Sequence, residues 1–362
     1  MTKPLWQYFD WGLLLIAILL TSIGVAMIYS ATIGSEVLAD AWRKQALYGA
    51  IGVVLMLLTA FINYRLLESL QWLLYVSTIL VLILTLIFGS SEISSVRRFI
   101  YIGGVSIQPA FPVLLLLIIS QASLLARNAP NAPGWQEFAL SLALSGTAGF
   151  LVYQQPNLST ATLYAAVWGA MLFTSGINLL YPGGLGISVL LSIPLILPHL
   201  PTYMQARIYN FQDPSRDPWA QYNLDQALIS IGSGGLWGKG YASGTQSQLH
   251  FLRVRHTDFI FSVICEELGF VGALLLLGLF GLLLWRLLHI AAHASDLTGQ
   301  LIVIGISTYI FYQLIVNLGM NLSLLPVAGL PLPFISNGGS ALVVAYIGLG
   351  LAESVAMRHR RL

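Results

Sequence analysis

Two long stretches of this sequence contain no charged side chain at all. Residues 138–206 and 297–352 lack Asp, Glu, Lys and Arg entirely. A helix needs about 20 largely apolar residues to cross a bilayer, so each stretch has room for more than one span. Charged residues make up 8% of the whole chain, whereas soluble globular proteins carry about 25%. So few charges cannot cover a water-facing surface, and we therefore expect a polytopic membrane protein.

Interruptions within these stretches predict the number of helices. Residues 154–157 and 178–186 divide the first stretch into three spans, and residues 325–340 divide the second into two. Five further apolar runs each predict one span: residues 12–35, 45–64, 69–91, 99–126 and 259–285. The alternating pattern of a transmembrane barrel is absent. The predicted fold is thus all-α, with ten transmembrane helices in one integral-membrane domain over residues 1–362.

Ten spans place both termini on one side of the membrane. That side carries basic residues in its short loops and in the C-terminal tail, which favours the cytoplasm. These residues are Arg65, Arg127, Arg286, Arg358, Arg360 and Arg361. The opposite side carries slightly more basic residues, but many lie in one long loop, about residues 200–257, and loops of that length cross regardless of charge. We expect cytoplasmic termini and an extracytoplasmic loop between the seventh and eighth helices.

The long loop is expected to be partly structured. It is rich in aromatic side chains, and residues 224–231 have the apolar spacing of a short amphipathic helix. The glycines of residues 232–235 would end that helix. A glycine-rich turn without a P-loop pattern is weak evidence for phosphate binding. Lys239 within it is therefore either a solvated cation or a phosphate contact.

Asp258 lies where this loop re-enters the membrane, and two interpretations compete for it. As a helix N-cap it would accept a backbone N–H, which stabilises a helix by about 1 kcal/mol. As a general base it would need a raised pKa, which its apolar neighbours favour. The nearby Arg253 and Arg255, together with His256, would oppose that rise.

Glu266 and Glu267 fall inside the next predicted helix. A rise of 1.5 Å per residue places them about 12–13 Å beyond Asp258, within the apolar layer. An ionisable side chain at that depth indicates a functional site. Glu266 falls within about 80° of Asp258 on a helical wheel, so the two could line one cavity. The alternative for both glutamates is a structural role in hydrogen bonding between helices.

The interruption at residues 325–340 poses a similar choice. Irregular backbone at membrane depth occurs only where protein buries it or where it lines a wet cavity. Ser336, Asn337 and Ser340 would bind either sugar hydroxyls or backbone groups there.

Composition excludes several other classes. A net charge of +2 gives no basic excess for binding nucleic acid. The single cysteine, Cys265, excludes an intrachain disulfide framework and a cysteine-based metal cluster. The outer basic residues either reach lipid headgroups or collect a phosphorylated ligand, because a guanidinium fits phosphate oxygens.

Six short segments carry a more specific signal. They are GSGGLWGKG (232–240), GTQSQL (244–249), RHTDFIF (255–261), EELG (266–269), NLGM (317–320) and LPLPFISNGGSAL (330–342). Together they resemble the SEDS (shape, elongation, division and sporulation) glycosyltransferases of bacterial cell walls, over nearly the whole chain. The GTQSQL run is closer to the elongation branch of that family than to its division branch.

The resemblance implies a polymerase of the bacterial cytoplasmic membrane that extends peptidoglycan strands from lipid II during cell elongation and shape maintenance. The 4-hydroxyl of incoming lipid II would attack the anomeric carbon of the growing strand and release undecaprenyl diphosphate. Asp258 matches the family's essential aspartate, which is implied to deprotonate or orient that hydroxyl on the outer face. The implied partner is a class B penicillin-binding protein, a single-span transpeptidase.

A diphosphate leaving group calls for positive charge on the outer face. The candidates for it are Arg98, Arg207, Lys239 and Arg255, with His256, Thr257, Gln246, Ser336 and Ser340 as further substrate contacts. Glu266 and Glu267 stay candidates as buried carboxylates. No cofactor is certain; a divalent cation could share the charge stabilisation, but no Asp-x-x-Asp motif is present to hold it.

Two departures from the family pattern weaken the inference of activity. Phe111 and Leu114 stand where the family usually has Glu and Lys, and Pro112 between them adds a helix disturbance. Asn337 stands where Tyr is common. Two alternatives therefore stay open: a flippase that moves lipid II across the membrane, and an inactive scaffold for the transpeptidase. Against the flippase, no inverted repeat is visible, and the charged features gather at one face.

Overall fold

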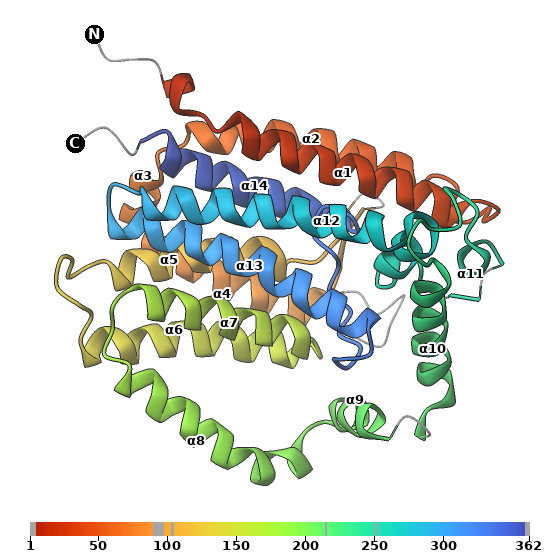
Figure 1. The fold of residues 1–362 in the computed structure, drawn as a ribbon. Helices are drawn as coiled ribbons and strands as arrows, with labels where there is room; N and C mark the ends of the chain where they lie inside the picture. The colour runs from red at the N-terminus through yellow and green to blue at the C-terminus, as the bar shows by residue number, and fades with distance from the viewer. Residues whose placement is uncertain are drawn as a thin grey trace.

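The computed structural model describes residues 5–89, 98–102, 105–213, 216–249, 251–252 and 254–358. Its long helices run side by side in a bundle, and both termini lie at one end of it (Figure 1). Three arginines of the sequence analysis, Arg253, Arg360 and Arg361, fall outside the described residues.

Six helices of the described chain are long and apolar enough to cross a membrane. They are α1 (Trp11–Thr32), α2 (Ala41–Phe61), α4 (Gln71–Phe88), α12 (Ile260–Ala292), α13 (Leu297–Asn321) and α14 (Gly339–Ala356). Shorter apolar helices are α5 (Ala110–Leu125), α7 (Leu158–Thr174) and α8 (Leu180–Ile196), and α6 (Trp135–Gln154) precedes α7. The helical membrane class is therefore confirmed, while the count of ten spans stays a prediction.

The predicted interruptions correspond to the observed helix ends. α6 ends at Gln154 and α13 at Asn321, each close to a predicted break. The break between α7 and α8 lies at residues 175–179, a few residues earlier than expected. Pro156 explains the first break, because its backbone preference acts locally, whereas Pro182 and Gly183 of the second predicted break lie inside α8.

The span predicted over residues 99–126 is wrong at its start. Its first residues form a small antiparallel hairpin of β1 (Ile100–Ile102) and β2 (Val105–Ile107), so the fold is not purely helical. Since α5 begins only at Ala110, Pro112 lies in the first helical turn. An N–H there has no partner within the helix, so the expected disturbance by Pro112 does not occur.

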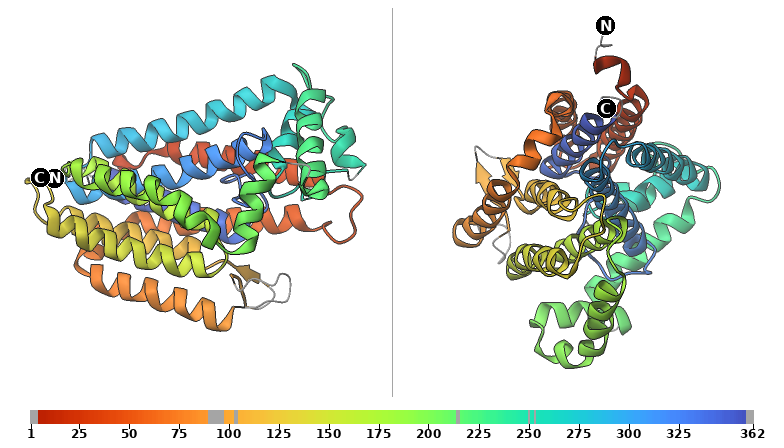
Figure 2. Two further views of the ribbon diagram at one scale, coloured as in Figure 1. Left: turned by 90° about the horizontal axis from the view of Figure 1, so that it is seen from below. Right: turned by 90° about the vertical axis from the view of Figure 1, so that its left-hand side faces the viewer.

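Burial separates the centre of the bundle from its lipid-facing edge. In α14, 78% of the apolar window is buried, against 17% in α4. α14 packs chiefly against α2, and α13 packs against α12, α7 and α5. α8 has no buried side chain among those described and lies at the periphery (Figure 2). Polar groups on α13 and α14 are therefore shielded from lipid.

Arginines tie together the end of the bundle that carries the termini. Arg286 pairs with Asp10 at 2.5 Å, and Arg65 pairs with Asp296 at 2.9 Å. Arg358 donates to the carbonyl of Phe61 at 2.7 Å, at the end of α2. Three basic residues expected on one side of the membrane thus lie together, as the charge analysis predicts.

The long loop is partly structured, as expected. It contains α9 (Thr202–Gln212), α10 (Pro218–Ser233) and α11 (Thr245–Gln248). The helix predicted over residues 224–231 is the second half of α10, which ends among the predicted glycines. Short elements elsewhere are η1 (Leu5–Tyr8), α3 (Tyr64–Ser69) and η2 (Leu197–His199). α10 runs across the end of the bundle opposite the termini (Figure 1).

Candidate functional site

Asp258 lies two residues before the start of α12 and does not cap it. The N-cap position is taken by Phe259, and no side chain caps this helix end. The N-cap interpretation of Asp258 is therefore wrong. Asp258 is half-buried, and its carboxylate accepts no hydrogen bond from the described residues. Because no donor of the described chain occupies this carboxylate, its oxygens can accept a proton or a hydrogen bond from a substrate.

Two arginines from distant parts of the chain act on this carboxylate. Burial raises the pKa of Asp258 from its ordinary 3.8 to about 6, and the charges of Arg98 and Arg207 oppose the rise. Arg98 lies two residues before β1, and Arg207 lies in α9. Arg255 and His256, which precede Asp258 in the sequence and were predicted to oppose the rise, do not contribute to it. Positive charge from these two arginines therefore acts on Asp258, while their role in binding a diphosphate stays a prediction.

The charge of Asp258 favours the charged form of Arg98, but burial and a second arginine outweigh it. Burial lowers the pKa of its guanidinium, and the nearby Arg207 lowers it further. Its Nε is buried and donates to no acceptor in the described part of the chain. A buried donor without a partner carries a free-energy cost that a bound anion would remove.

Arg255 is directed elsewhere. Its Nε donates to the carbonyl of Ala31 near the end of α1, and only 8% of the residue is exposed. Burial lowers the pKa of His256, and Arg255 lowers it further. Thr257 uses its hydroxyl locally, on the carbonyl of Val254 at 3.3 Å. Arg255 and Thr257 are thus engaged in holding this segment rather than free for a substrate.

Val254 marks strain in the same segment. Its φ is +43°, in the left-handed region that a β-branched side chain rarely adopts. Such strain persists where surrounding structure over-determines it, often at functional sites.

The segment between α13 and α14 holds the backbone that leads to Asp258. Ser336 Oγ donates to the Thr257 carbonyl at 2.7 Å and accepts the Leu332 N–H at 2.8 Å. The Asn337 N–H donates to the His256 carbonyl at 3.0 Å. Ser336 was predicted to bind either sugar hydroxyls or backbone groups, and in the structure it binds backbone groups.

Ser340 lies at the start of α14. Its Oγ accepts the N–H of Gln108 at 3.5 Å, which joins α14 to the segment before α5. Gln246 sits in α11, where its N–H donates to Glu266 at 3.0 Å. The Gln246 Oε1 is buried and accepts no hydrogen bond from the described residues.

A backbone break explains why the glutamates of α12 lie where they do. Gly269 has φ +67°, so the intrahelical ladder stops there. The Lys239 N–H donates to the Glu266 carbonyl at 2.9 Å, and the Phe270 N–H donates to the Gly235 carbonyl at 2.9 Å. The glycine-rich turn thus inserts its backbone into the break, and its glycines serve close packing rather than phosphate binding.

The two glutamates fasten this turn to the bundle. Glu266 is fully buried and pairs with Lys239 at 2.8 Å. Glu267 accepts the hydroxyl of Ser30 from α1 and the N–H of Ala242 at 3.0 Å. The structural interpretation therefore applies to both residues. The Glu266 carboxylate is bonded by Lys239, Thr245 and Gln246 of the loop, and a cavity shared with Asp258 stays a prediction.

Replacing Lys239 by Met is expected to destabilise the protein by about 2 kcal/mol, because it leaves the buried Glu266 carboxylate without its cation. The Lys239 side chain is 27% exposed, so the loss is smaller than for a fully buried pair. Cys265, the single cysteine and a buried one, allows the measurement by thiol labelling during unfolding. Adding Glu266→Gln should restore part of the stability. Lost activity with unchanged labelling would instead identify Lys239 as a phosphate contact.

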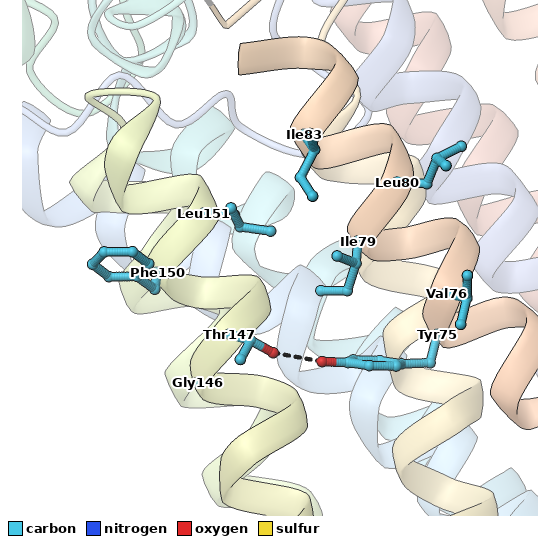
Figure 3. A pocket seen from close by; sticks show the side chains of 9 residues that line it. All are labelled: Tyr75, Val76, Ile79, Leu80, Ile83, Gly146, Thr147, Phe150 and Leu151. Carbon is cyan, nitrogen blue, oxygen red and sulfur yellow. Dashed lines mark hydrogen bonds between the residues drawn. The ribbon is translucent and has the colours of Figure 1, made fainter. Parts of the chain in front are cut away.

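A large cavity elsewhere has no acidic or basic side chain in its lining. It lies between α4 and α6, holds about 650 Å³, and has almost entirely apolar walls (Figure 3). Tyr75 lines it, and its hydroxyl already hydrogen-bonds with Thr147 at 2.5 Å. This cavity is suited to alkyl chains rather than to glycosyl transfer.

The two apolar residues that replace the family's usual Glu and Lys are buried in the bundle. Phe111 and Leu114 are 2% and 1% exposed, and the Phe111 ring meets Tyr309 of α13 edge-on, with centroids 6.4 Å apart. Packing therefore occupies the place of a charged pair. In the described residues no group of three His, Cys, Asp or Glu side chains is placed to hold a metal ion.

Two residues next to Asp258 were not among the predicted site residues, although one of them, Asn317, opens the NLGM segment of the family resemblance. Asn317 and Asn321 of α13 both donate to the Asp258 carbonyl, at 3.3 and 2.9 Å. Their spacing of one helical turn puts them on one face, and both were visible as amides inside an apolar run. What they bind is set by the packing of α13 against the segment before α12.

Comparisons with known proteins extend over the full chain. Residues 10–361 match the FtsW/RodA/SpoVE family model, described as a cell cycle protein. The chain is 36% identical to the peptidoglycan glycosyltransferase MrdB of Escherichia coli K12, over 99% of this chain and 97% of that protein. It resembles the crystal structure of the Thermus thermophilus rod shape determining protein RodA with a TM-score of 0.74 and 30% identity, covering 99% of this chain and 100% of that one. A chain from a peptidoglycan synthase complex that coordinates polymerization and crosslinking gives a TM-score of 0.83 and 31% identity, covering 98% and 99%.

Proposed function

Since the chain belongs to the FtsW/RodA/SpoVE family, we propose that it is a peptidoglycan glycosyltransferase that polymerises lipid II at the bacterial cytoplasmic membrane. The observation that carries the proposal is the half-buried Asp258, free of hydrogen bonds to its carboxylate in the described chain and close to two arginines. It lies where the long loop meets the bundle, at the end opposite the termini. A lipid-linked sugar presents its reacting atoms at that depth.

Asp258 acts as the general base in this proposal. The 4-hydroxyl of incoming lipid II attacks the anomeric carbon of the strand, so that a new C–O bond forms as the bond to the diphosphate oxygen breaks. The hydroxyl proton goes to Asp258, and the bonding electrons leave with undecaprenyl diphosphate. A pKa of about 6 keeps most of the carboxylate ionised at pH 7 while making it more basic than an ordinary aspartate.

Arg98 and Arg207 stabilise the departing diphosphate. Negative charge grows on its oxygens in the transition state, and preorganised cations lower the energy of that state. The unpaired buried Nε of Arg98 supports this assignment, because a phosphate oxygen would complete its hydrogen bonding. A divalent cation that accompanies the diphosphate is a further proposal, and chelation during the assay tests it.

Orientation and partner follow from the same assignment. We place the termini in the cytoplasm and Asp258 on the outer face, where peptidoglycan is built. The likeness to a chain of a synthase complex that couples polymerization to crosslinking supports a class B penicillin-binding protein as the partner.

Polymerisation of lipid II by the purified protein in detergent tests the proposal. We expect glycan strands on a gel, from the protein alone or with its transpeptidase. Detergent removes the two sides of the membrane, so strand formation excludes pure transport. If the protein makes no strands but moves lipid II across liposome bilayers, it is a flippase instead. If it shows neither activity, the scaffold is the interpretation that is left.

The rate of polymerisation is expected to fall on the acid side with a midpoint near pH 6. Only the ionised carboxylate of Asp258 accepts a proton, and its pKa is about 6. At one pH unit below that value about a tenth of the enzyme is active. In Arg207→Gln the midpoint should rise, because removing a positive charge makes ionisation of Asp258 harder. A profile flat from pH 5 to 8 would rule out this base.

A further inference from the structure

The carbonyl of Asp258 lies outside the helix that follows it. The Ser262 N–H, which would serve that carbonyl in a longer helix, donates to Phe259 instead, at 3.1 Å. A buried carbonyl without a donor costs free energy, so donors must come from another element. Asn317 and Asn321 of α13 supply them, at 3.3 and 2.9 Å.

These amides are themselves held in one orientation. The Ser262 hydroxyl donates to Asn321 Oδ1 at 2.7 Å, so the NH₂ group of Asn321 must face the Asp258 carbonyl. Asn317 also donates to the Leu330 carbonyl at 2.9 Å. All three side chains, Asn317, Asn321 and Ser262, are fully buried. The network therefore connects α12, α13 and the segment before α14 at one point.

The carboxylate of Asp258 has no such support. It accepts no hydrogen bond from the described residues, whereas the carbonyls of His256, Thr257 and Asp258 all accept one or more. Its direction is therefore set through its own backbone. Because a misplacement of about 1 Å lowers a rate by up to about 100-fold, the groups that hold this backbone bear on catalysis.

We propose that Asn317 and Asn321 are positioning residues, which aim the Asp258 carboxylate at the acceptor hydroxyl by clamping the Asp258 carbonyl. This inference rests on the proposed glycosyltransferase function and adds to it the residues that orient the base. Neither amide touches the substrate. Each amide also donates to a second carbonyl, that of Leu330 for Asn317 and that of Asn317 for Asn321. Asn321 is the main clamp because its bond to the Asp258 carbonyl is the shorter one, 2.9 Å against 3.3 Å.

Asn321→Leu tests the inference, since leucine fills a similar volume without an N–H donor. We expect kcat for strand formation to fall by about 10- to 100-fold with KM nearly unchanged. The acid midpoint should move below pH 6, because a loosened carboxylate reaches water and burial is the main cause of its raised pKa. A purely structural amide would change the folded fraction and leave the midpoint in place.

Gln313→Leu is the matched control. Gln313 lies one turn before Asn317 on the same helix, is 1% exposed, and its Nε2 donates to no acceptor in the described residues. Within the described residues it makes no hydrogen bond to Asp258, so the kcat and midpoint of this variant should equal those of the wild type. Equal kcat and midpoint in Asn321→Leu and Gln313→Leu would overturn the proposal. If Asn321→Leu does not fold, Asn321→Ala replaces it; failure of both while Gln313→Leu folds would assign the amides to stability alone.

An infrared titration separates this inference from the proposed function. The carbonyl band of protonated Asp258 is the band that Asp258→Asn lacks, and its midpoint needs no turnover. A wild type without polymerase activity would refute the proposed function, while a band midpoint shifted in Asn321→Leu but not in Gln313→Leu would still support the clamp. An active wild type with an unshifted Asn321→Leu would refute the clamp alone.

Discussion

Asp258→Asn is expected to lower the rate of strand formation by about 10³-fold, because removal of a general base costs two to four orders of magnitude. Asparagine keeps the shape of the side chain but cannot accept the hydroxyl proton. The loss should fall on kcat, since Arg98 and Arg207 still bind the diphosphate. Gel analysis of strands made from lipid II at saturating concentration measures it.

The control for this variant is Asp225→Asn. Asp225 is an exposed carboxylate of α10, at the same end of the bundle, and has no part in the proposed chemistry. Its variant should polymerise at the wild-type rate. A decrease of less than about tenfold in Asp258→Asn would show that another group takes the proton and would end the assignment of the base.

Gly234→Ala is expected to have the largest effect on stability. A Cβ at this position would lie 1.9 Å from the Cys265 carbonyl oxygen, and that atom is backbone and cannot rotate away. Overpacking of this kind costs about 3 kcal/mol or more. The inserted turn would be forced out of the break in α12, and Cys265 would become accessible. Labelling of Cys265 by a thiol-reactive dye under native conditions should therefore accelerate strongly.

Gly232→Ala provides the comparison. It lies two residues earlier in α10, and a Cβ there would meet nothing within 4 Å. Alanine favours a helix over glycine by about 0.5–1 kcal/mol, so this variant should be as stable as the wild type or slightly more stable. Equal labelling of Cys265 in the two variants would mean that the turn does not pack against α12 as described.

The residues near Asp258 show which parts of the site could be predicted from neighbouring residues in the sequence. The sequence identified Asp258 as the candidate base, and its segment carried the family resemblance that the comparisons confirm over the whole chain. The N-cap interpretation failed because the helix begins one residue later than an N-cap at Asp258 requires. The expected influence of Arg255 failed because its side chain reaches the end of α1 instead. Neighbours in sequence are thus poor guides to neighbours in space at this site.

What the sequence by itself determined is the membrane class, the helical spans and the places where they break. Apolar length and the backbone limits of Gly and Pro act within a few residues, so these features can be read in order along the chain. Only the tertiary structure decided which groups surround Asp258: Arg98 before β1, Arg207 from α9 and two amides from α13. Charge and hydrogen bonding depend on distance through space, and only the packing of the whole fold brings these segments together.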